Sequence, residues 1–136
     1  MGAGPAKILA LDYGPARTGV AVSDPTGTVA RPLEVVERAD GQAGLARILE
    51  LARVEEVGRI VVGMPLTLKG ERGEQAIATE AFVDRLRAAT DVEVDTYDER
   101  FTTRVARQHK RGKQEDAVAA AYLLTGYLTW IAGRLA

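Results

Sequence analysis

The chain has 136 residues, no cysteine and a formal net charge of −1, from 18 Lys and Arg against 19 Asp and Glu. This length suits a single domain, residues 1–136, with a full hydrophobic core. The lack of cysteine excludes disulfides, thiolate metal sites and a cysteine nucleophile. Because the overall charge is near zero, contact with nucleic acid would have to come from a local basic patch.

The beginning of the chain, MGAGPAK, lacks the apolar segment of a signal peptide. No apolar run reaches the roughly 18 residues that a membrane-spanning helix requires. Together with the lack of cysteine, these features predict a cytoplasmic protein.

The first half of the chain predicts an antiparallel meander followed by a helix. Apolar runs predict strands over residues 7–11, 18–23 and about 29–36. The Asp-Pro-Thr-Gly sequence at 24–27 is typical of a tight turn, because Pro presets φ and Gly accepts a positive φ. Apolar residues at helical spacing predict an amphipathic helix over 41–54.

The second half of the chain alternates between strands and helices. It predicts a doubly buried strand over 59–63, a polar loop over 66–73, a helix over 74–89, a strand over 92–97, a helical stretch from about residue 102 and a helix over about 114–135. In the helix over 74–89, the spacing favours Ile77, Ala81, Phe82 and Leu86 as the inward face.

This order predicts an α/β fold. Right-handed crossovers place the fourth strand beside the first, and the fifth beside the fourth. We therefore expect a five-stranded mixed sheet of order 3-2-1-4-5 with helices on both faces. Functional groups gather at the carboxyl ends of parallel strands in such sheets, and Asp12, the 64–73 loop and Glu99 all fall at that edge.

Three acidic residues form a candidate site. Asp12 ends the first strand, Glu99 follows the fifth, and Asp116 stands at the start of the last helix. Three converging carboxylates would repel one another unless a divalent cation neutralised them, and clustered carboxylates favour Mg²⁺ or Mn²⁺. Each residue also has a plain structural reading: Asp12 as the cap of a turn, Glu99 in a surface ion pair, and Asp116 at a helix N-terminus.

Basic residues surround this candidate site in the sequence. They predict contacts to the phosphates of a nucleic acid, although charge runs are more often solvated faces. The candidates are Arg17, Lys69, Arg72, Arg100, Arg104, Arg107, Lys110, Arg111 and Lys113. For Arg17 the plain alternative is an ion pair that holds the turn after the first strand.

Four motifs occur in order: D-Y-G-x-x-R-T-G-V-A-V-S-D, G-M-P-x-x-x-x-G, D-E-R-F-T-T and D-x-x-A-A. Over about residues 7–128 the chain resembles the YqgF family, also called the RuvX-type nucleases, of the RNase H-like superfamily. The resemblance implies an RNase H-like fold and a metal-dependent nuclease that matures the 5′ end of precursor 16S ribosomal RNA in ribosome biogenesis. It also implies that Asp12, Glu99 and Asp116 are the catalytic, metal-binding residues.

The chain departs from the family pattern between Arg104 and Asp116, where it is shorter, and at Lys113, where resolvase relatives carry a further ligand. Three alternatives remain open at this point: a Holliday-junction resolvase acting on branched DNA, a catalytically weak RNA-binding assembly factor, and an actin-like nucleotide hydrolase. The last needs two such domains. A resolvase should be a homodimer, since a junction has two-fold symmetry, whereas an RNA nuclease could be a monomer.

Overall fold

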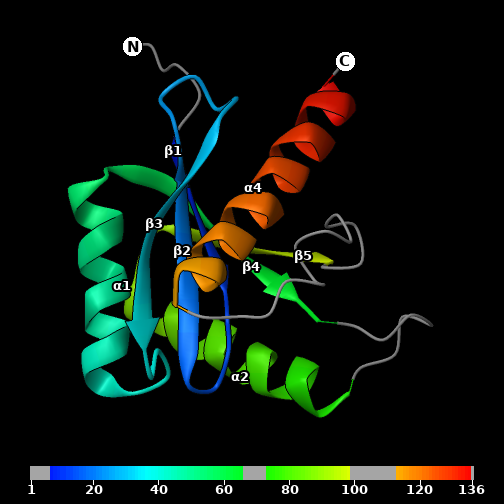
Figure 1. Cartoon of the computed structure of the whole chain (residues 1–136). Coiled ribbons are helices and arrows are strands. Elements are labelled where there is room, and N and C mark those ends of the chain that lie inside the picture. Colours follow the sequence, from blue (N-terminus) through cyan, green and yellow to red (C-terminus); the bar gives the residue numbers. More distant parts are fainter. Residues whose placement is uncertain (1–6, 66–72, 99–112, 136) are drawn as a thin grey trace.

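The computed structural model describes residues 7–65, 73–98 and 113–135 (Figure 1). Its elements are β1 (Lys7–Asp12), β2 (Arg17–Ser23), β3 (Ala30–Glu37), α1 (Gln42–Val54), β4 (Val57–Met64), α2 (Glu74–Ala89), β5 (Glu93–Asp98) and α4 (Lys113–Leu135). Every strand and helix predicted within these ranges is present, with ends that shift by one or two residues at most. The helical stretch predicted from about residue 102 lies outside the described residues.

The five strands form one mixed sheet in the order β3-β2-β1-β4-β5, which confirms the predicted topology. β1 pairs antiparallel with β2 and parallel with β4, and β4 pairs parallel with β5. The central strands β1 and β4 carry near-continuous apolar runs because both of their faces are covered. None of the helices in the described ranges combines the length and apolar character that a membrane crossing requires.

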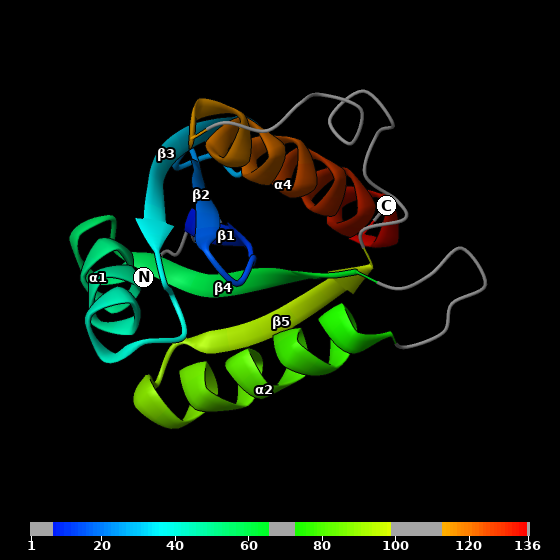
Figure 2. The ribbon, with the colours of Figure 1, turned by 60° about the horizontal axis from the view of Figure 1, so that its bottom comes forward.

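The helices divide between the two faces of the sheet, as Figure 2 shows. Leu9 and Leu11 of β1 point into a core that α1 and α2 cover. Ile8 and Ala10 point to the opposite side, into a core that α4 covers. Since side chains alternate along a strand, Asp12 lies on the α4 face.

The inward face of α2 differs from the prediction. Phe82 and Leu86 are buried as expected, but Ile77 is 54% exposed and Ala81 is also exposed. The buried stripe instead comprises Ala76, Thr79, Phe82, Val83 and Leu86. The hydroxyl of Thr79 donates to the backbone carbonyl of Gln75. Hydrophobicity alone was misleading here, because the predicted and the observed stripes both have helical spacing and share Phe82 and Leu86.

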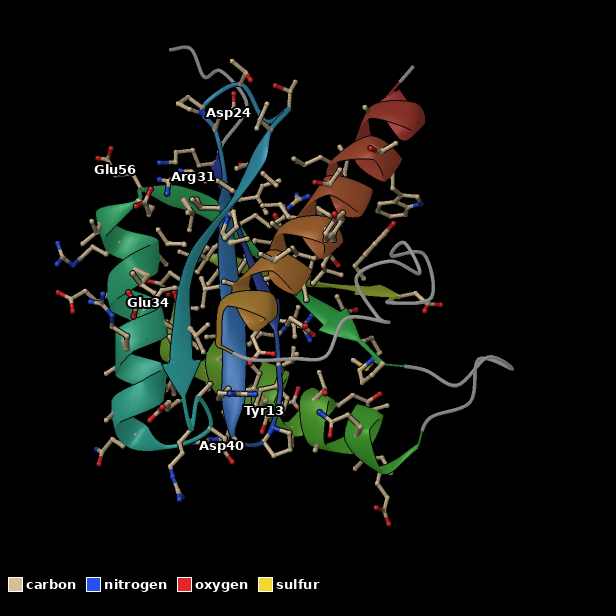
Figure 3. The ribbon with its side chains drawn as sticks, viewed as in Figure 1. Tyr13, Asp24, Arg31, Glu34, Asp40 and Glu56 are labelled. Atoms are coloured by element: carbon tan, nitrogen blue, oxygen red, sulfur yellow. The ribbon has the colours of Figure 1, made fainter. Side chains whose placement is uncertain are left out.

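The hairpin between β2 and β3 is fixed by local chemistry. Asp24, labelled in Figure 3, accepts hydrogen bonds from the backbone N–H groups of Thr28 and Val29, and Gly27 has a φ of 74°. The hydroxyl of Thr26 and these backbone groups lower the pKa of Asp24 from 3.8 to about 2. The predicted turn at 24–27 is confirmed.

The first described turns of α4 pack directly on β2 at Gly19. A Cβ on Gly19 would overlap the backbone carbonyl of Asp116 and would lie 3.0 Å from the nitrogen of Ala117. In the β1–β2 ladder Gly19 is the partner of Asp12. Because Gly19 has no side chain, the backbone of Asp116 can lie against it, directly across the ladder from Asp12.

Further along α4, a buried tyrosine ties the helix to β4 and β5. Tyr127 has no exposed surface; its hydroxyl accepts from Arg59 at 2.9 Å and donates to Asp95 at 2.9 Å. Burial raises the pKa of Tyr127 above 10, so the hydroxyl keeps its proton at neutral pH. With the contact at Gly19, this network fixes α4 at two points along its length.

We expect Gly19→Ala to reduce the free energy of unfolding by about 1–3 kcal/mol, because the methyl group must displace the backbone of α4. The control is Gly133→Ala in the same helix, where no outside atom lies within 4 Å of the new Cβ. That change should stabilise by about 0.5–1 kcal/mol through helix propensity. Urea unfolding measures both, and equal effects of the two substitutions would contradict the close contact at Gly19.

Candidate functional site

The carboxyl ends of β1, β4 and β5 meet at one edge of the sheet. β1 ends at Asp12, β4 at Met64 and β5 at Asp98. The parallel register places Leu11 beside Val62, and Met64 beside Asp98. Asp12 therefore stands next to the end of β4, at the edge where α/β sheets gather their functional groups.

The turn after β1 is held against α2. Tyr13, labelled at this edge in Figure 3, stacks on Phe82 with ring centroids 4.4 Å apart. The side-chain amide of Gln75 donates to the carbonyl of Tyr13 at 3.4 Å. Burial, and then the negative charge of Asp40, raise the pKa of Tyr13, which keeps its hydroxyl protonated. These contacts fix the backbone that immediately follows Asp12.

Asp116 is buried at the N-terminal part of α4 and forms an ion pair with Arg17. The Nε of Arg17 lies 2.9 Å from Oδ2 of Asp116. The carboxylate side chain is only 8% exposed, whereas that of Arg17 is 34% exposed. A buried carboxylate needs a cation or hydrogen bonds nearby, and Arg17 supplies the cation in this structure.

The structure brings two of the three predicted acidic residues to one place. Asp12 and Asp116 lie on the same face and at the same edge, joined through Gly19: the strand pairing sets Asp12 opposite Gly19, and the backbone of Asp116 rests on Gly19. Glu99, the third, directly follows the last residue of β5 in sequence and lies outside the described residues.

Among the predicted phosphate contacts, Arg17 is placed beside Asp116, and Lys113 is the first residue of α4. The remaining seven lie outside the described residues: Lys69, Arg72, Arg100, Arg104, Arg107, Lys110 and Arg111.

Sequence reasoning did not identify Gly19 as part of the site. A signal was present, because an isolated glycine inside an apolar strand often marks the close approach of another backbone. The partner of Arg17 was also not predicted, since 99 positions separate it from Asp116 in the sequence (116 − 17) and no local pattern connects them.

The donor set suits a hard cation. Both described acidic residues offer carboxylate oxygens, the ligands that Mg²⁺ and Mn²⁺ prefer. Within the described ranges no group of three His, Cys, Asp or Glu side chains could hold a metal ion. The described residues thus provide two carboxylates of a possible set of three.

This fold is that of an RNase H-like domain. One carboxylate, Asp12, lies at the carboxyl end of the central strand β1, and another, Asp116, lies near the beginning of the last helix. The solved structure of Thermus thermophilus RuvC in complex with a Holliday-junction substrate has the same fold. The TM-score is 0.60 at 19% sequence identity, covering 94% of this chain and 96% of that chain.

Residues 6–130 match the family RuvX, described as Holliday junction resolvase. A relative from Rubrobacter xylanophilus is 45% identical over 130 residues, covering 90% of this chain and 91% of its own length. A relative from Chloroflexus aurantiacus is 40% identical over 130 residues, covering 89% of this chain and 85% of its own length. Both are named "Putative pre-16S rRNA nuclease". The chain therefore belongs to the RuvX family, as the sequence motifs predicted.

The pair formed by Arg17 and Asp116 should be energetically coupled. In a double-mutant cycle of Arg17→Gln and Asp116→Asn, we expect a coupling free energy of about 1 kcal/mol or more, because the carboxylate is almost fully buried. Urea unfolding of the four proteins measures it. The exposed pair Arg53 and Glu50, 3.6 Å apart, is the control and should show weaker coupling. Strict additivity at Arg17 and Asp116 would contradict the ion pair.

Proposed function

We propose that this protein is a divalent-metal-dependent nuclease that hydrolyses phosphodiester bonds, with Asp12, Asp116 and Glu99 as its catalytic carboxylates. The observation that carries the proposal is the convergence of Asp12 and Asp116 on one face of the sheet edge. These carboxylates come from a strand and from a helix about one hundred residues later. Membership of the RuvX family supports the same function.

The carboxylates fit a resident Mg²⁺ or Mn²⁺. Asp12 and Asp116 would hold the ion, with Glu99 as the third ligand. Such an ion supplies an activated water and stabilises the departing oxygen of a phosphodiester. The residues themselves contribute rigid placement: pairing with β2 and β4 fixes the backbone of Asp12, and the contact with Gly19 fixes that of Asp116.

Arg17 has two roles in this proposal. Its guanidinium pairs with Asp116 in the structure described here and holds this buried carboxylate in position. It also stands at the rim of the acidic site as a donor for a phosphate oxygen, the pairing for which a guanidinium is suited. We propose that Lys113 and the seven predicted basic residues outside the described ranges contact the nucleic acid around it.

We propose precursor 16S ribosomal RNA as the substrate and the cytoplasm as the location, since the similar relatives carry that name. A four-way DNA junction is the second candidate, favoured by the description of the RuvX family. Junction cleavage would require two sites related by two-fold symmetry, and therefore a dimer. An RNA-binding assembly factor without efficient chemistry is the outcome if cleavage fails.

The purified protein should cleave nucleic acid in Mg²⁺ or Mn²⁺ and lose this activity in EDTA. Asp12→Asn and Asp116→Asn should each reduce the rate at least about 100-fold, because each removes a proposed metal ligand while preserving side-chain shape. Labelled single-stranded RNA, a pre-16S 5′ leader and a four-way DNA junction serve as substrates, and gel analysis measures the rates.

The matched control is Asp91→Asn, the same chemical change at an exposed residue just before β5, at the opposite end of that strand. It should leave the rate unchanged. Preference among the three substrates separates RNA processing from junction cleavage. RNA binding without metal-dependent cleavage of any substrate would overturn the nuclease proposal and leave the assembly factor.

A further inference from the structure

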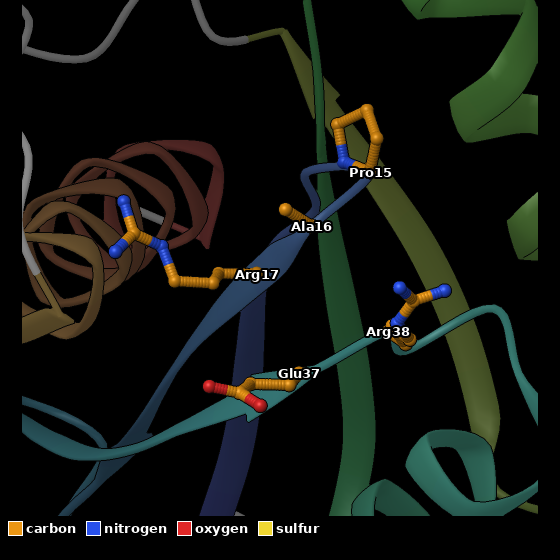
Figure 4. A pocket seen from close by; sticks show the side chains of 5 residues that line it. All are labelled: Pro15, Ala16, Arg17, Glu37 and Arg38. Carbon is orange, nitrogen blue, oxygen red and sulfur yellow. The ribbon is translucent and has the colours of Figure 1, made fainter.

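An open pocket of about 550 Å³ lies beside the acidic site, where β2 begins and β3 ends. Its lining residues are Pro15, Ala16, Arg17, Glu37 and Arg38 (Figure 4). Figure 4 shows Arg17 extending toward α4, while Arg38 lies on the opposite side of the pocket, just after the end of β3. Because Arg17 also pairs with Asp116, the pocket and the acidic site share one side chain.

The backbone of Arg38 is held in an unusual conformation. Its φ is 49°, in the left-handed region that non-glycine residues rarely adopt. The N–H of Arg38 donates to the carbonyl of Ala16 at 3.0 Å, and its carbonyl accepts from Gly41 at 2.9 Å. Gly44 packs so closely that a Cβ there would overlap the carbonyl of Arg38. Three backbone contacts therefore set the direction in which this side chain leaves the chain.

The side chain of Arg38 is exposed and forms no ion pair or hydrogen bond within the described part of the chain. The arginines of the neighbouring elements do form such pairs: Arg31 with Glu55, and Arg47 with Glu34. A strained left-handed residue would normally be a glycine or asparagine, and such strain is characteristic of functional positions. Among the described residues, no contact of the Arg38 side chain accounts for an arginine at this position.

The positive charge that the pocket can offer to a ligand comes mainly from Arg38. Arg17 is already neutralised by Asp116. Glu37 is the register partner of Arg17 on β3, so its carboxylate stands on the Arg17 side of the pocket, away from Arg38. Arg38 is therefore a positioned guanidinium whose donors have no partner among the described residues. A guanidinium binds phosphate oxygens with two parallel hydrogen bonds.

We infer that this pocket is a phosphate subsite with Arg38 as its principal donor. It binds a phosphodiester of the nucleic-acid backbone that neighbours, along the strand, the phosphodiester at the acidic site. The inference rests on the proposed function, since it assumes that a nucleic acid lies along this edge. Arg17 connects the two positions. Contact with a phosphate carries no base specificity, so the subsite serves RNA and DNA strands alike.

The test measures equilibrium binding of labelled single-stranded RNA, a pre-16S leader and a four-way DNA junction in EDTA, over a series of salt concentrations. Arg38→Gln should weaken binding of each by about three- to tenfold. It should also make the negative slope of log affinity against log salt shallower, by about 0.7 for single-stranded RNA and about 0.9 for the duplex arms of the junction, the values for one phosphate contact. Glu37→Gln should strengthen binding, because it removes a negative charge from the pocket.

Two further variants separate binding from folding. Arg38→Gly removes the side chain and the left-handed strain together, so it should weaken binding as Arg38→Gln does while the Tm stays equal or rises. Arg53→Gln makes the same change of charge in the last turn of α1, at the other edge of the sheet, and should leave affinity and slope unchanged.

If the parent protein binds and Arg38→Gln retains its affinity and salt slope, the subsite is overturned while the proposed function stands. If Arg53→Gln weakens binding as much as Arg38→Gln does, the effect is one of overall charge and the subsite is also overturned. If the parent binds none of the three nucleic acids, both the proposed function and the subsite fail.

Discussion

The close approach of α4 to β2 at Gly19 is the contact on which the site depends. Any side chain at this position would hold the backbone of Asp116 away from the strand. Gly19 is also the ladder partner of Asp12, so one absent Cβ sets the separation of two carboxylates that are far apart in the sequence. The apolar contacts of α4 and the hydrogen bonds of Tyr127 hold the rest of the helix in register with that point.

That approach has an electrostatic consequence. A carboxylate at Asp116, almost fully buried and facing the same edge as Asp12, is costly unless a positive charge lies nearby. Arg17 provides that charge from the first residue of β2, two positions before Gly19 and on the same face. Strand alternation thus places two residues of β2 on the same side of the sheet: Gly19, which allows the close approach of α4, and Arg17, which neutralises Asp116. The same arginine borders the pocket in which Arg38 stands.

Some errors of prediction have a clear physical origin. In α2, hydrophobicity favoured Ile77 on the inward face, but the helix turns a stripe containing Ala76 and Thr79 toward the sheet. Both stripes obey helical periodicity, so periodicity alone does not choose between them. Arg38 was missed for a related reason. Its left-handed backbone results from hydrogen bonds with Ala16 and Gly41 and from the contact with Gly44, and an arginine carries no local signal of such a conformation.

The sequence by itself determined the strands, the helices, their order in the sheet and the position of Asp12 at its edge. These features follow from local periodicity, from turn residues such as Asp24 and Gly27, and from the handedness of crossovers. Its motifs also identified the family. Only the tertiary structure decided that Asp116 lies at the same edge as Asp12 and that Arg17 forms an ion pair with Asp116. It also decided that the side chain of Arg38 has no partner in the described part of the chain. These relations depend on the packing of one helix against one glycine, a contact between residues distant in sequence that no local pattern encodes.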